Sequence, residues 1–466
     1  MMTSQTDYVT QLNEATIKVI LGRNAKHHIP EFITVLKPYK KADISIRVLA
    51  LGNISEEYKN IVAKLLDGLY NRGKDPISGS PYQWPYLNSR GSNLSKVFNI
   101  KYEFDQNLEV VNLDEIKKDI SNFFDYTDKR YTVHLVVGEE KSFNQFHDIL
   151  KVYAKIEGVR LQFIKLSTLR KIFHKMYKYA IPLNLAIQFL AKSGDGTPWI
   201  PDQEVYKEIS KEYGISNGLV IGISFARPHE KIVYGVGFFS TFNNYYQKFE
   251  LEEFELEESL NTSEGLYVPK DKMADLLEKG LRWYREVVHS DPPLVIIYKT
   301  SPLHKEEKEA IKDVLGNTRW VFIHAQYTTS ERLFDTSKED FYVERGTVWV
   351  QRRNKWKPES DDFYHSKVTI AATGYIKPVI LGKVPYIPPL GTPKPIRLNI
   401  FTNIDINPEA VAKVTLLQIK ADWEHLNIKS RKIAVLKYSN RFARLLQCAL
   451  KNGIDGFRKA DIRDIL

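Results

Sequence analysis

The sequence predicts an α/β protein in which a Rossmann-like parallel sheet precedes a second sheet with a long buried strand. Between residues 43 and 180, strand-like apolar runs alternate with helical patterns, the order that produces a parallel sheet. Residues 219–225 (LVIGISF) form an apolar run bounded by turn residues, which is typical of a central strand buried on both faces. The length of 466 residues allows two or three domains.

The elements of the first sheet follow one another as strand, helix, strand, helix, strand. The expected strands are 44–52, 131–138 and 159–164, and the expected helices are 55–69 and 142–157. Ser55 is the expected N-cap of the first helix, and the spacing of Ser142 and Gln145 predicts a capping box on the second. Residues 73–95, rich in proline and glycine, predict an irregular loop.

The second half continues as a mixed sheet with covering helices. Residues 231–239 predict a strand antiparallel to 219–225, because a short turn joins the two runs. Apolar residues between 273 and 288 fall on one stripe of a helix and are expected in the core. Further inner strands are expected at 294–301 and 320–324.

Composition favours a polyanionic partner but does not establish one. The 67 Lys and Arg exceed the 57 Asp and Glu and give a net charge of +10, which a solvated Lys-rich surface also produces. Cys448 is the only cysteine, so neither an internal disulfide nor a cysteine zinc site can form. The sequence shows neither a leader pattern nor an apolar run of 18 residues, and we expect a cytoplasmic protein without a membrane segment.

Four polar residues could converge on a terminal phosphate. His147 and Lys151 are four apart and share one face of the helix expected at 142–157. Gln162 lies on the following strand, and Lys192 lies near the end of a helix that begins at Pro182. Lysines would supply charge, and the imidazole and amide would supply directed hydrogen bonds. A solvated helix face gives the same spacing, and basic and aromatic residues alternate between 165 and 178, a pattern that suits either base stacking or an amphipathic surface helix.

Residues 184–199 (NLAIQFLAKSGDGTPW) carry a resemblance to a known family. They resemble the stretch where the guide-binding MID domain of prokaryotic Argonautes passes into the RNase H-like PIWI domain. Residues 385–395 (PYIPPLGTPKP) are similar to the Gly-Thr-Pro-x-Pro loop of PIWI domains. The resemblance implies an N-terminal segment at 1–42, a MID domain at 43–180 and a PIWI domain at 181–466.

The resemblance assigns roles to the candidate phosphate site. It implies that His147, Lys151, Gln162 and Lys192 hold the 5′ phosphate of a guide, with His147 where the family commonly has tyrosine. It also implies that the terminal carboxylate of Leu466 shares a divalent cation, Mg²⁺ or Mn²⁺, with that phosphate. This cation would not be catalytic.

The resemblance also implies that the PIWI domain has lost its nuclease centre. Two-metal nucleases of this class need carboxylates that clamp two cations. Ser224 and Thr300 stand where the first and second catalytic aspartates would be. Asp422 or Glu424 could supply a lone carboxylate, but one carboxylate is not a two-metal site, and a surface acid explains either residue equally well.

The layout resembles short prokaryotic Argonautes, which have no PAZ domain. The implied function is binding of a 5′-phosphorylated guide RNA that pairs with a DNA target, without cleavage. The implied partner is an APAZ-containing protein, bound as a heterodimer, with an effector that can be membrane-associated. The implied biological role is defence against plasmids or viruses by abortive infection.

Two alternatives remain open at the level of the sequence. The first is an active, metal-dependent RNase H-like nuclease that uses Asp422, Glu424 and further acids that the sequence does not place. The second is a protein whose first half binds a small nucleotide. It is disfavoured because the first strand ends in Leu51-Gly52-Asn53-Ile54, without a Gly-x-Gly-x-x-Gly motif or a P-loop.

Overall fold

The computed structural model describes most of the chain in two compact units. The described residues are 8–11, 19–21, 25–27, 42–70, 102–104, 108–171, 180–194, 196–201, 217–229, 232–241, 248–255, 261–262, 265–334, 336, 343, 345–351, 364–371, 395–424 and 431–466. The nine-stranded unit comprises Met1–Val19, Pro201–Asp422 and Asn427–Arg444, and the parallel-sheet unit comprises Ile20–Ile200, Trp423–Leu426 and Leu445–Leu466. The first of these units thus resumes at Pro201, and the last 22 residues belong with the parallel sheet.

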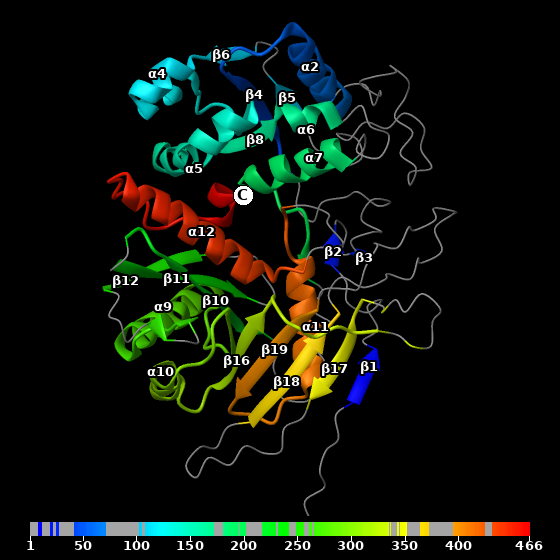
Figure 1. Ribbon diagram of the computed structural model, residues 1–466, viewed down its shortest axis with the longest axis vertical. Coiled ribbons are helices and arrows are strands. Elements are labelled where there is room, and N and C mark those ends of the chain that lie inside the picture. The colour runs from blue at the N-terminus through cyan, green and yellow to red at the C-terminus, as the bar shows by residue number, and fades with distance from the viewer. Residues whose placement is uncertain are drawn as a thin grey trace, which may run out of the picture. The chain divides into compact units, whose positions relative to one another are not determined.

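The parallel-sheet unit has the Rossmann-like sheet that the sequence predicts. Its strand order is β5-β4-β7-β8, β6 also pairs with β4, and all of these pairs are parallel. The strands are β4 (Ile44–Leu51), β5 (Tyr102–Phe104), β6 (Glu109–Val111), β7 (Val133–Gly138) and β8 (Leu161–Lys165). The helices are α2 (Glu56–Tyr70), α4 (Leu113–Lys118), η3 (Ile120–Tyr126), α5 (Glu140–Glu157), α6 (Leu166–Arg170), α7 (Ala180–Lys192) and α13 (Ile462–Ile465). A separate three-stranded sheet consists of β3 (Ala25–His27), β2 (Val19–Leu21) and β9 (Ile200–Pro201), of which β2 and β3 are labelled in Figure 1.

Helix α5, which carries two candidate site residues, begins earlier than predicted. Its N-cap is Glu139, without a side-chain capping bond, and Ser142 is buried inside the first turn, so the predicted capping box is wrong. The physical reason is packing: Phe143 of the first turn lies against Gly138, where an added Cβ would be 2.9 Å from its ring. The helix ends at Gly158 in the left-handed conformation, with φ of 70°, as the sequence predicts.

The second sheet is mixed and has nine strands. Their order is β1-β17-β18-β19-β16-β15-β10-β11-β12, in which β10, β15 and β16 are parallel to one another and the other neighbours are antiparallel. The strands are β1 (Tyr8–Gln11), β10 (Leu219–Ala226), β11 (Ile232–Thr241), β12 (Lys248–Glu255), β15 (Leu294–Lys299), β16 (Arg319–Gln326), β17 (Thr347–Gln351), β18 (Tyr364–Ile370) and β19 (Ile396–Thr402). A separate hairpin joins β13 (Asn261–Thr262) and β14 (Gly265–Leu266). The predicted central strand and its antiparallel neighbour are confirmed by β10 and β11.

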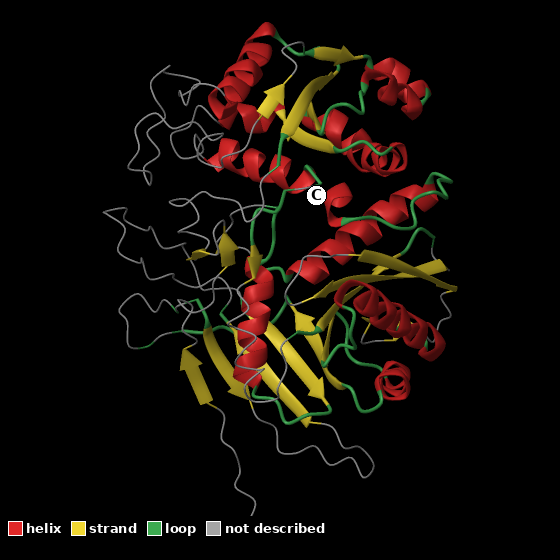
Figure 2. Cartoon of the chain, turned by 180° about the vertical axis from the view of Figure 1, so that it is seen from behind, coloured by secondary structure: helices red, strands yellow, loops and turns green. Residues whose placement is uncertain are grey.

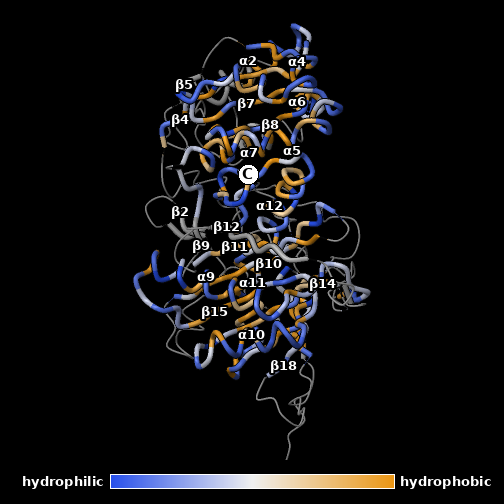
Figure 3. Tube along the Cα trace, turned by 90° about the vertical axis from the view of Figure 1, so that its left-hand side faces the viewer, coloured by the Kyte–Doolittle hydropathy of each residue, from blue (hydrophilic) through white to orange (hydrophobic). Residues whose placement is uncertain are grey.

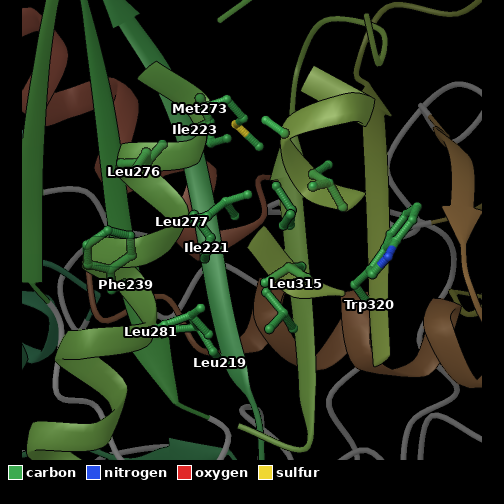
Figure 4. Packing of buried hydrophobic residues seen from close by; sticks show 14 of the residues in the cluster. Leu219, Ile221, Ile223, Phe239, Met273, Leu276, Leu277, Leu281, Leu315 and Trp320 are labelled. Carbon is green, nitrogen blue, oxygen red and sulfur yellow. The ribbon is translucent and has the colours of Figure 1, made fainter. Parts of the chain in front are cut away.

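Helices cover both faces of this sheet. Helices α9 (Lys270–Val288) and α10 (Lys305–Leu315) pack their apolar stripes on one face of β10 and β15, where Leu219, Ile221 and Ile223 meet Met273 and Leu276 among others (Figure 4). Helix α11 (Pro408–Lys420) crosses β17 and β18 on the other side (Figure 2). The central strands are correspondingly hydrophobic in Figure 3.

The first turn of α12 (Ala434–Lys451) lies close to β10. An added Cβ at Gly222 would be only 2.6 Å from the carbonyl oxygen of Val435, so glycine permits this approach. Within the described part of the chain, the helices are too short or too polar to cross a membrane. The predicted loop 73–95, most of the basic and aromatic stretch at 172–178, and residues 385–394 of the proline-rich loop lie outside the described residues.

Candidate functional site

Lys151 is the centre of the candidate site in the parallel-sheet unit. It lies on α5 with 3% of its surface exposed. Its Nζ donates to the backbone oxygen of Leu466 at 2.7 Å and to that of Ile465 at 3.1 Å. Helix α13, which carries this tail, contacts both α5 and α7. A residue predicted from local spacing therefore contacts the last two residues of the sequence.

A second lysine fixes the same tail to α5. Lys155 lies one turn after Lys151, and its Nζ is 3.1 Å from the carboxylate of Asp464. Asp461 and Asp464 form a capping box on α13, and Asp461 accepts from the backbone N–H of Arg463 at 2.9 Å. Burial raises the pKa of Asp461, while the backbone hydrogen bond from Arg463 acts in the opposite direction. The short tail helix is thus held by its own cap and by two lysines of α5.

Lys192 and Arg160 are in contact at the end of α7. Lys192 is the last residue of α7 and is 1% exposed. Its backbone oxygen accepts a hydrogen bond of 2.6 Å from Nη1 of Arg160, which precedes β8. Gly194, with φ of 88°, follows, and an added Cβ there would be 2.7 Å from the Arg160 guanidinium. Arg160 was not singled out by the sequence, where it is one basic residue before a strand.

His147 and Gln162 lie on neighbouring elements of the same unit. The His147 ring lies 4.6 Å from the Phe163 ring, and its Nδ1 is 2.7 Å from Asp148. Gln162, on β8, donates from Nε2 to the Phe163 carbonyl at 3.1 Å. Its Oε1 is buried and has no hydrogen-bond partner among the residues that the structure describes. A buried acceptor without a partner is unfavourable by about 1–3 kcal/mol and marks a place where a ligand can contribute a donor.

The structure joins two of the predicted residues directly, since Lys151 donates to Leu466. The five predicted residues, His147, Lys151, Gln162, Lys192 and Leu466, all belong to the parallel-sheet unit, on α5, β8, α7 and the tail. Buried ammonium groups are stabilised by full negative charges more than by carbonyl dipoles. A phosphate group would therefore be a stronger partner for a buried lysine than the two oxygens that Lys151 contacts.

Ser224 and Thr300, which the sequence analysis expects in place of two catalytic aspartates, lie at the carboxyl ends of neighbouring parallel strands of the nine-stranded sheet. Ile223 of β10 is in register with Lys299 of β15, so Ser224 and Thr300 are the next residues on two parallel strands. Ser224 is 7% exposed, whereas Thr300 is exposed. A hydroxyl and a hydroxyl at this edge offer neutral oxygens where a two-metal centre needs carboxylates.

A buried ion pair occupies the core beside this edge. Lys299 and Glu307 are fully buried and 2.5 Å apart. The Glu307 carboxylate also accepts from the backbone N–H of Val268 at 2.8 Å and of His304 at 3.0 Å. Burial lowers the pKa of Lys299, and attraction to Glu307 acts in the opposite direction. Glu307 is therefore committed to a structural role.

Asp422 is likewise engaged by neighbouring side chains. It is 3% exposed, pairs with the Lys437 ammonium, and accepts from the Tyr438 hydroxyl at 2.8 Å. The backbone carbonyl of Glu424 accepts a hydrogen bond from the Gln188 side chain. In the part of the chain that the structure describes, no three His, Cys, Asp or Glu residues are grouped so that they could hold a metal ion.

Comparison with known proteins places these two units in context. Residues 132–382 match the family model of the Piwi domain. The fold is similar to Clostridium butyricum Argonaute bound to a guide DNA and a 19-mer target DNA (TM-score 0.69, 15% identity over 99% of this chain) and to Drosophila Piwi (TM-score 0.62, 14% identity over 94% of this chain). The chain spans 55% and 54% of those two chains. No curated protein sequence matches it.

Proposed function

Because the chain belongs to the Piwi-domain family, we propose that it is a guide-directed nucleic-acid-binding protein. The parallel-sheet unit would hold the 5′ phosphate of a guide strand, and base pairing between guide and target would supply sequence specificity. The observation that carries this proposal is the buried ammonium of Lys151, which donates a hydrogen bond to Leu466. The net charge of +10 supports a polyanionic ligand.

Each predicted residue has a definite part in this proposal. Lys151 and Lys192 supply positive charge to the phosphate, and His147 supplies a directed hydrogen bond from a ring packed on Phe163. The unpartnered Oε1 of Gln162 accepts from a donor group of the first nucleotide of the guide. The proposed domains are the MID domain at 43–180 and the PIWI domain at 181–466.

We further propose that Mg²⁺ or Mn²⁺ joins the guide phosphate to the carboxylate of Leu466. Mg²⁺ commonly binds through one or two carboxylates plus substrate phosphates and keeps several waters. This fits a site that offers the oxygen of Leu466 beside Lys151 and, among the described residues, no metal-holding group made of protein side chains alone. The ion would neutralise phosphate charge and have no catalytic role.

The decisive experiment compares guides with and without a 5′ phosphate. Lys151→Met removes the ammonium but keeps an unbranched side chain. Loss of charge-assisted hydrogen bonds of about 1.5–3 kcal/mol predicts affinity for a 5′-phosphorylated guide about 10- to 150-fold weaker. Fluorescence anisotropy measures this affinity, and RNA guides and DNA guides are tested separately.

Lys141→Met is the matched control, because Lys141 is an exposed lysine in the first turn of the same helix. It should bind phosphorylated guides as the unaltered protein does. A 5′-hydroxyl guide should bind weakly to all three proteins. Equal affinity of the unaltered protein for 5′-phosphate and 5′-hydroxyl guides would refute the proposal.

We also propose that the protein binds its target without cutting it. Ser224 and Thr300 at the sheet edge and the pairing of Asp422 with Lys437 support this. The test incubates the guide-loaded protein and labelled complementary target with Mg²⁺ or Mn²⁺, and intact target is expected. Cleavage that disappears in Asp422→Asn would instead establish the metal-dependent nuclease.

The remaining parts of the proposal follow the resemblance to short prokaryotic Argonautes. We propose an RNA guide, a DNA target, and a heterodimer with an APAZ-containing protein that carries an effector, acting in defence against plasmids or viruses. Purification from the native cells tests this: the protein should carry short 5′-phosphorylated RNAs and a stoichiometric partner. Bound guides made of DNA, or a protein recovered alone with its guide, would contradict these parts.

A further inference from the structure

Arg160 directly precedes β8 in the parallel-sheet unit and is half buried. Its backbone oxygen accepts from the N–H of His134 at 2.8 Å, which ties this end of β8 to β7. Because side chains alternate along a strand, the Arg160 side chain leaves the backbone on the same side as that of Gln162, two residues further on. The strand that carries one predicted site residue therefore also carries a guanidinium on the same side.

The guanidinium of Arg160 caps the last turn of α7. Its Nη1 donates to the backbone carbonyl of Lys192 at 2.6 Å. The last four carbonyls of a helix have no partner inside the helix, and the helix dipole favours a cation at that end. Lys192 is the last residue of α7 and is 1% exposed. Arg160 therefore fixes the backbone from which a buried ammonium of the candidate site extends.

Gly194 lies directly against this guanidinium. It has φ of 88°, and an added Cβ would be 2.7 Å from Nη1 of Arg160 and 3.4 Å from Nη2. Gly158, the C-cap of α5, is also left-handed with φ of 70°, but among the described residues an added Cβ there would meet nothing within 4 Å. The chain thus offers two glycines of similar backbone conformation, of which only Gly194 contacts Arg160.

The same guanidinium acts on the cap of α13. Asp461 caps this helix by accepting from the backbone N–H of Arg463 at 2.9 Å. Burial raises the pKa of Asp461, whereas the hydrogen bond and charge of Arg463 and the charge of Arg160 act in the opposite direction. Arg160 is therefore near enough to stabilise the carboxylate that begins the helix leading to Leu466.

Three parts of the candidate site lie outside α5, and Arg160 is linked to all of them. It is hydrogen-bonded to Lys192, it shares a side of the strand with Gln162, and its charge acts on the cap of the tail helix. A guanidinium is suited to this place, because its five N–H donors form a rigid fork that can serve several acceptors at once. The contacts of Arg160 thus converge on the residues proposed to hold the guide phosphate.

We propose that Arg160 is a positioning residue of the guide-binding site, which holds Lys192 and the α13 tail in the arrangement that recognises a 5′ phosphate. This inference rests on the proposed function and adds to it a residue that acts through Lys192 rather than on the phosphate. A residue of this kind changes the discrimination between guides with and without a 5′ phosphate. A residue that served stability alone would change the free energy of unfolding and leave the discrimination by the folded protein unaltered.

Two substitutions test the contact from its two sides. Arg160→Gln removes the charge and the fork, and Gly194→Ala forces the guanidinium away from the Lys192 carbonyl. In the full-length protein, each should weaken binding of a 5′-phosphorylated guide about tenfold, the lower end of what a hydrogen bond to a charged group contributes, because the effect is indirect. The affinity for a 5′-hydroxyl guide should stay the same. Fluorescence anisotropy measures both affinities.

Each variant has a matched control in the same unit. Gly158→Ala introduces a side chain at a left-handed position without reaching a guanidinium. Arg130→Gln removes an arginine whose side chain is 87% exposed and pairs with Asp128. Both controls should bind the two guides as the unaltered protein does. Weakening of phosphorylated guides by Gly158→Ala as large as that by Gly194→Ala would assign the effect to backbone strain and overturn the proposal.

A double variant separates positioning from direct contact with the phosphate. If Arg160 acts through Lys192, then Arg160→Gln should weaken binding of a phosphorylated guide by less than about threefold when Lys192→Met is already present, because the two residues are coupled. A further tenfold loss in the double variant would mean that Arg160 contacts the phosphate itself, and the positioning role would be wrong.

Hydrogen exchange tests the same contact without a guide. Amides in the last turn of α7 and in α13 should exchange faster in Arg160→Gln and in Gly194→Ala than in Gly158→Ala, because the capping contact is lost. Equal exchange of these amides in all three variants would contradict the proposal.

The two proposals fail in different ways. If the unaltered protein binds 5′-phosphate and 5′-hydroxyl guides equally, the proposed function fails and the positioning role fails with it. If the unaltered protein distinguishes the two guides and both Arg160→Gln and Gly194→Ala distinguish them equally well, only the positioning role is wrong.

Discussion

Each unit of the molecule buries lysines, and Lys299 of one unit and Lys151 of the other have different partners. Lys299 faces Glu307, an acid held by two backbone N–H groups inside the core of the nine-stranded unit. Lys151 faces the backbone oxygens of Leu466 and Ile465 in a four-residue helix at the end of the sequence. The Lys299 ammonium is paired with a side-chain carboxylate inside the core, whereas the Lys151 ammonium donates to backbone oxygens of a short tail helix. Burial of a lysine therefore does not by itself identify a ligand site, and the group that the ammonium contacts must be known as well.

The largest expected effect comes from removing the fixed anion. Glu307→Ala leaves a buried ammonium and two backbone N–H groups without their acceptor, so we expect the free energy of unfolding of the nine-stranded unit to fall by about 3–5 kcal/mol. Urea denaturation measures it. Glu309→Ala is the control on the same helix, because Glu309 is 41% exposed and its ion pairs with Lys270 and Lys305 are 3.6 and 3.9 Å long.

A double variant sharpens this prediction. Replacing both charges, as in Lys299→Met with Glu307→Leu, should recover much of the lost stability, because a buried pair can often be exchanged for apolar residues. If Glu307→Ala costs no more than Glu309→Ala, then the pair is not the structural element that its burial indicates.

The next effect is a pH dependence that originates beside Lys299. His324 is in register with Lys299 on the adjacent strand and is 5% exposed. Burial first, and then the Lys299 ammonium, lower the pKa of His324 to about 4, while a backbone hydrogen bond at Thr300 acts in the opposite direction. Between that value and the ordinary 6.5, the unfolded chain binds a proton that the folded chain does not.

Stability from His324 is therefore complete above pH 6.5 and is lost progressively as the pH falls from 6.5 to about 4. At pH 5 we expect its contribution to the free energy of unfolding to be about 2 kcal/mol smaller than at pH 8. Denaturation midpoints at the two pH values should differ less in His324→Gln than in the unaltered protein. His229→Gln, at an exposed position, should keep the original dependence. An unchanged pH dependence in His324→Gln would assign the effect to other groups.

The comparison also shows what local sequence can predict. Strands β4, β7 and β10 were predictable because their continuous apolar runs leave few alternatives. Lys151 was predictable as a candidate from its spacing to His147, but its contact with Leu466 spans 315 positions and depends on how α13 packs. The start of α5 was missed because Ser142 has the residue pattern of a cap while Phe143 fixes the turn on Gly138.

Other features of the structure have no local signal in the sequence. Glu307 stands beside Glu306 in an acidic stretch, and only the fold shows that one of the two is fully buried against Lys299. The segment 327–334 has no long apolar period, and its order comes from Arg397, Thr369 and Arg431, which are distant in sequence. Polar networks between distant elements are thus the part of the molecule that sequence patterns leave undetermined.

The smallest expected effect distinguishes the two lysines of α5. Lys155 is one turn from Lys151, but its side chain is 34% exposed and its partner is Asp464, so the pair is worth about 0.2–1 kcal/mol. Lys155→Met should therefore weaken binding of a 5′-phosphorylated guide by less than about fivefold, compared with at least tenfold for Lys151→Met. Fluorescence anisotropy with the same guides measures the loss of affinity in both variants. Equal losses of affinity would mean that both lysines act only by positioning α13, which both contact. A larger loss in Lys151→Met would mean that its buried ammonium contacts the phosphate itself.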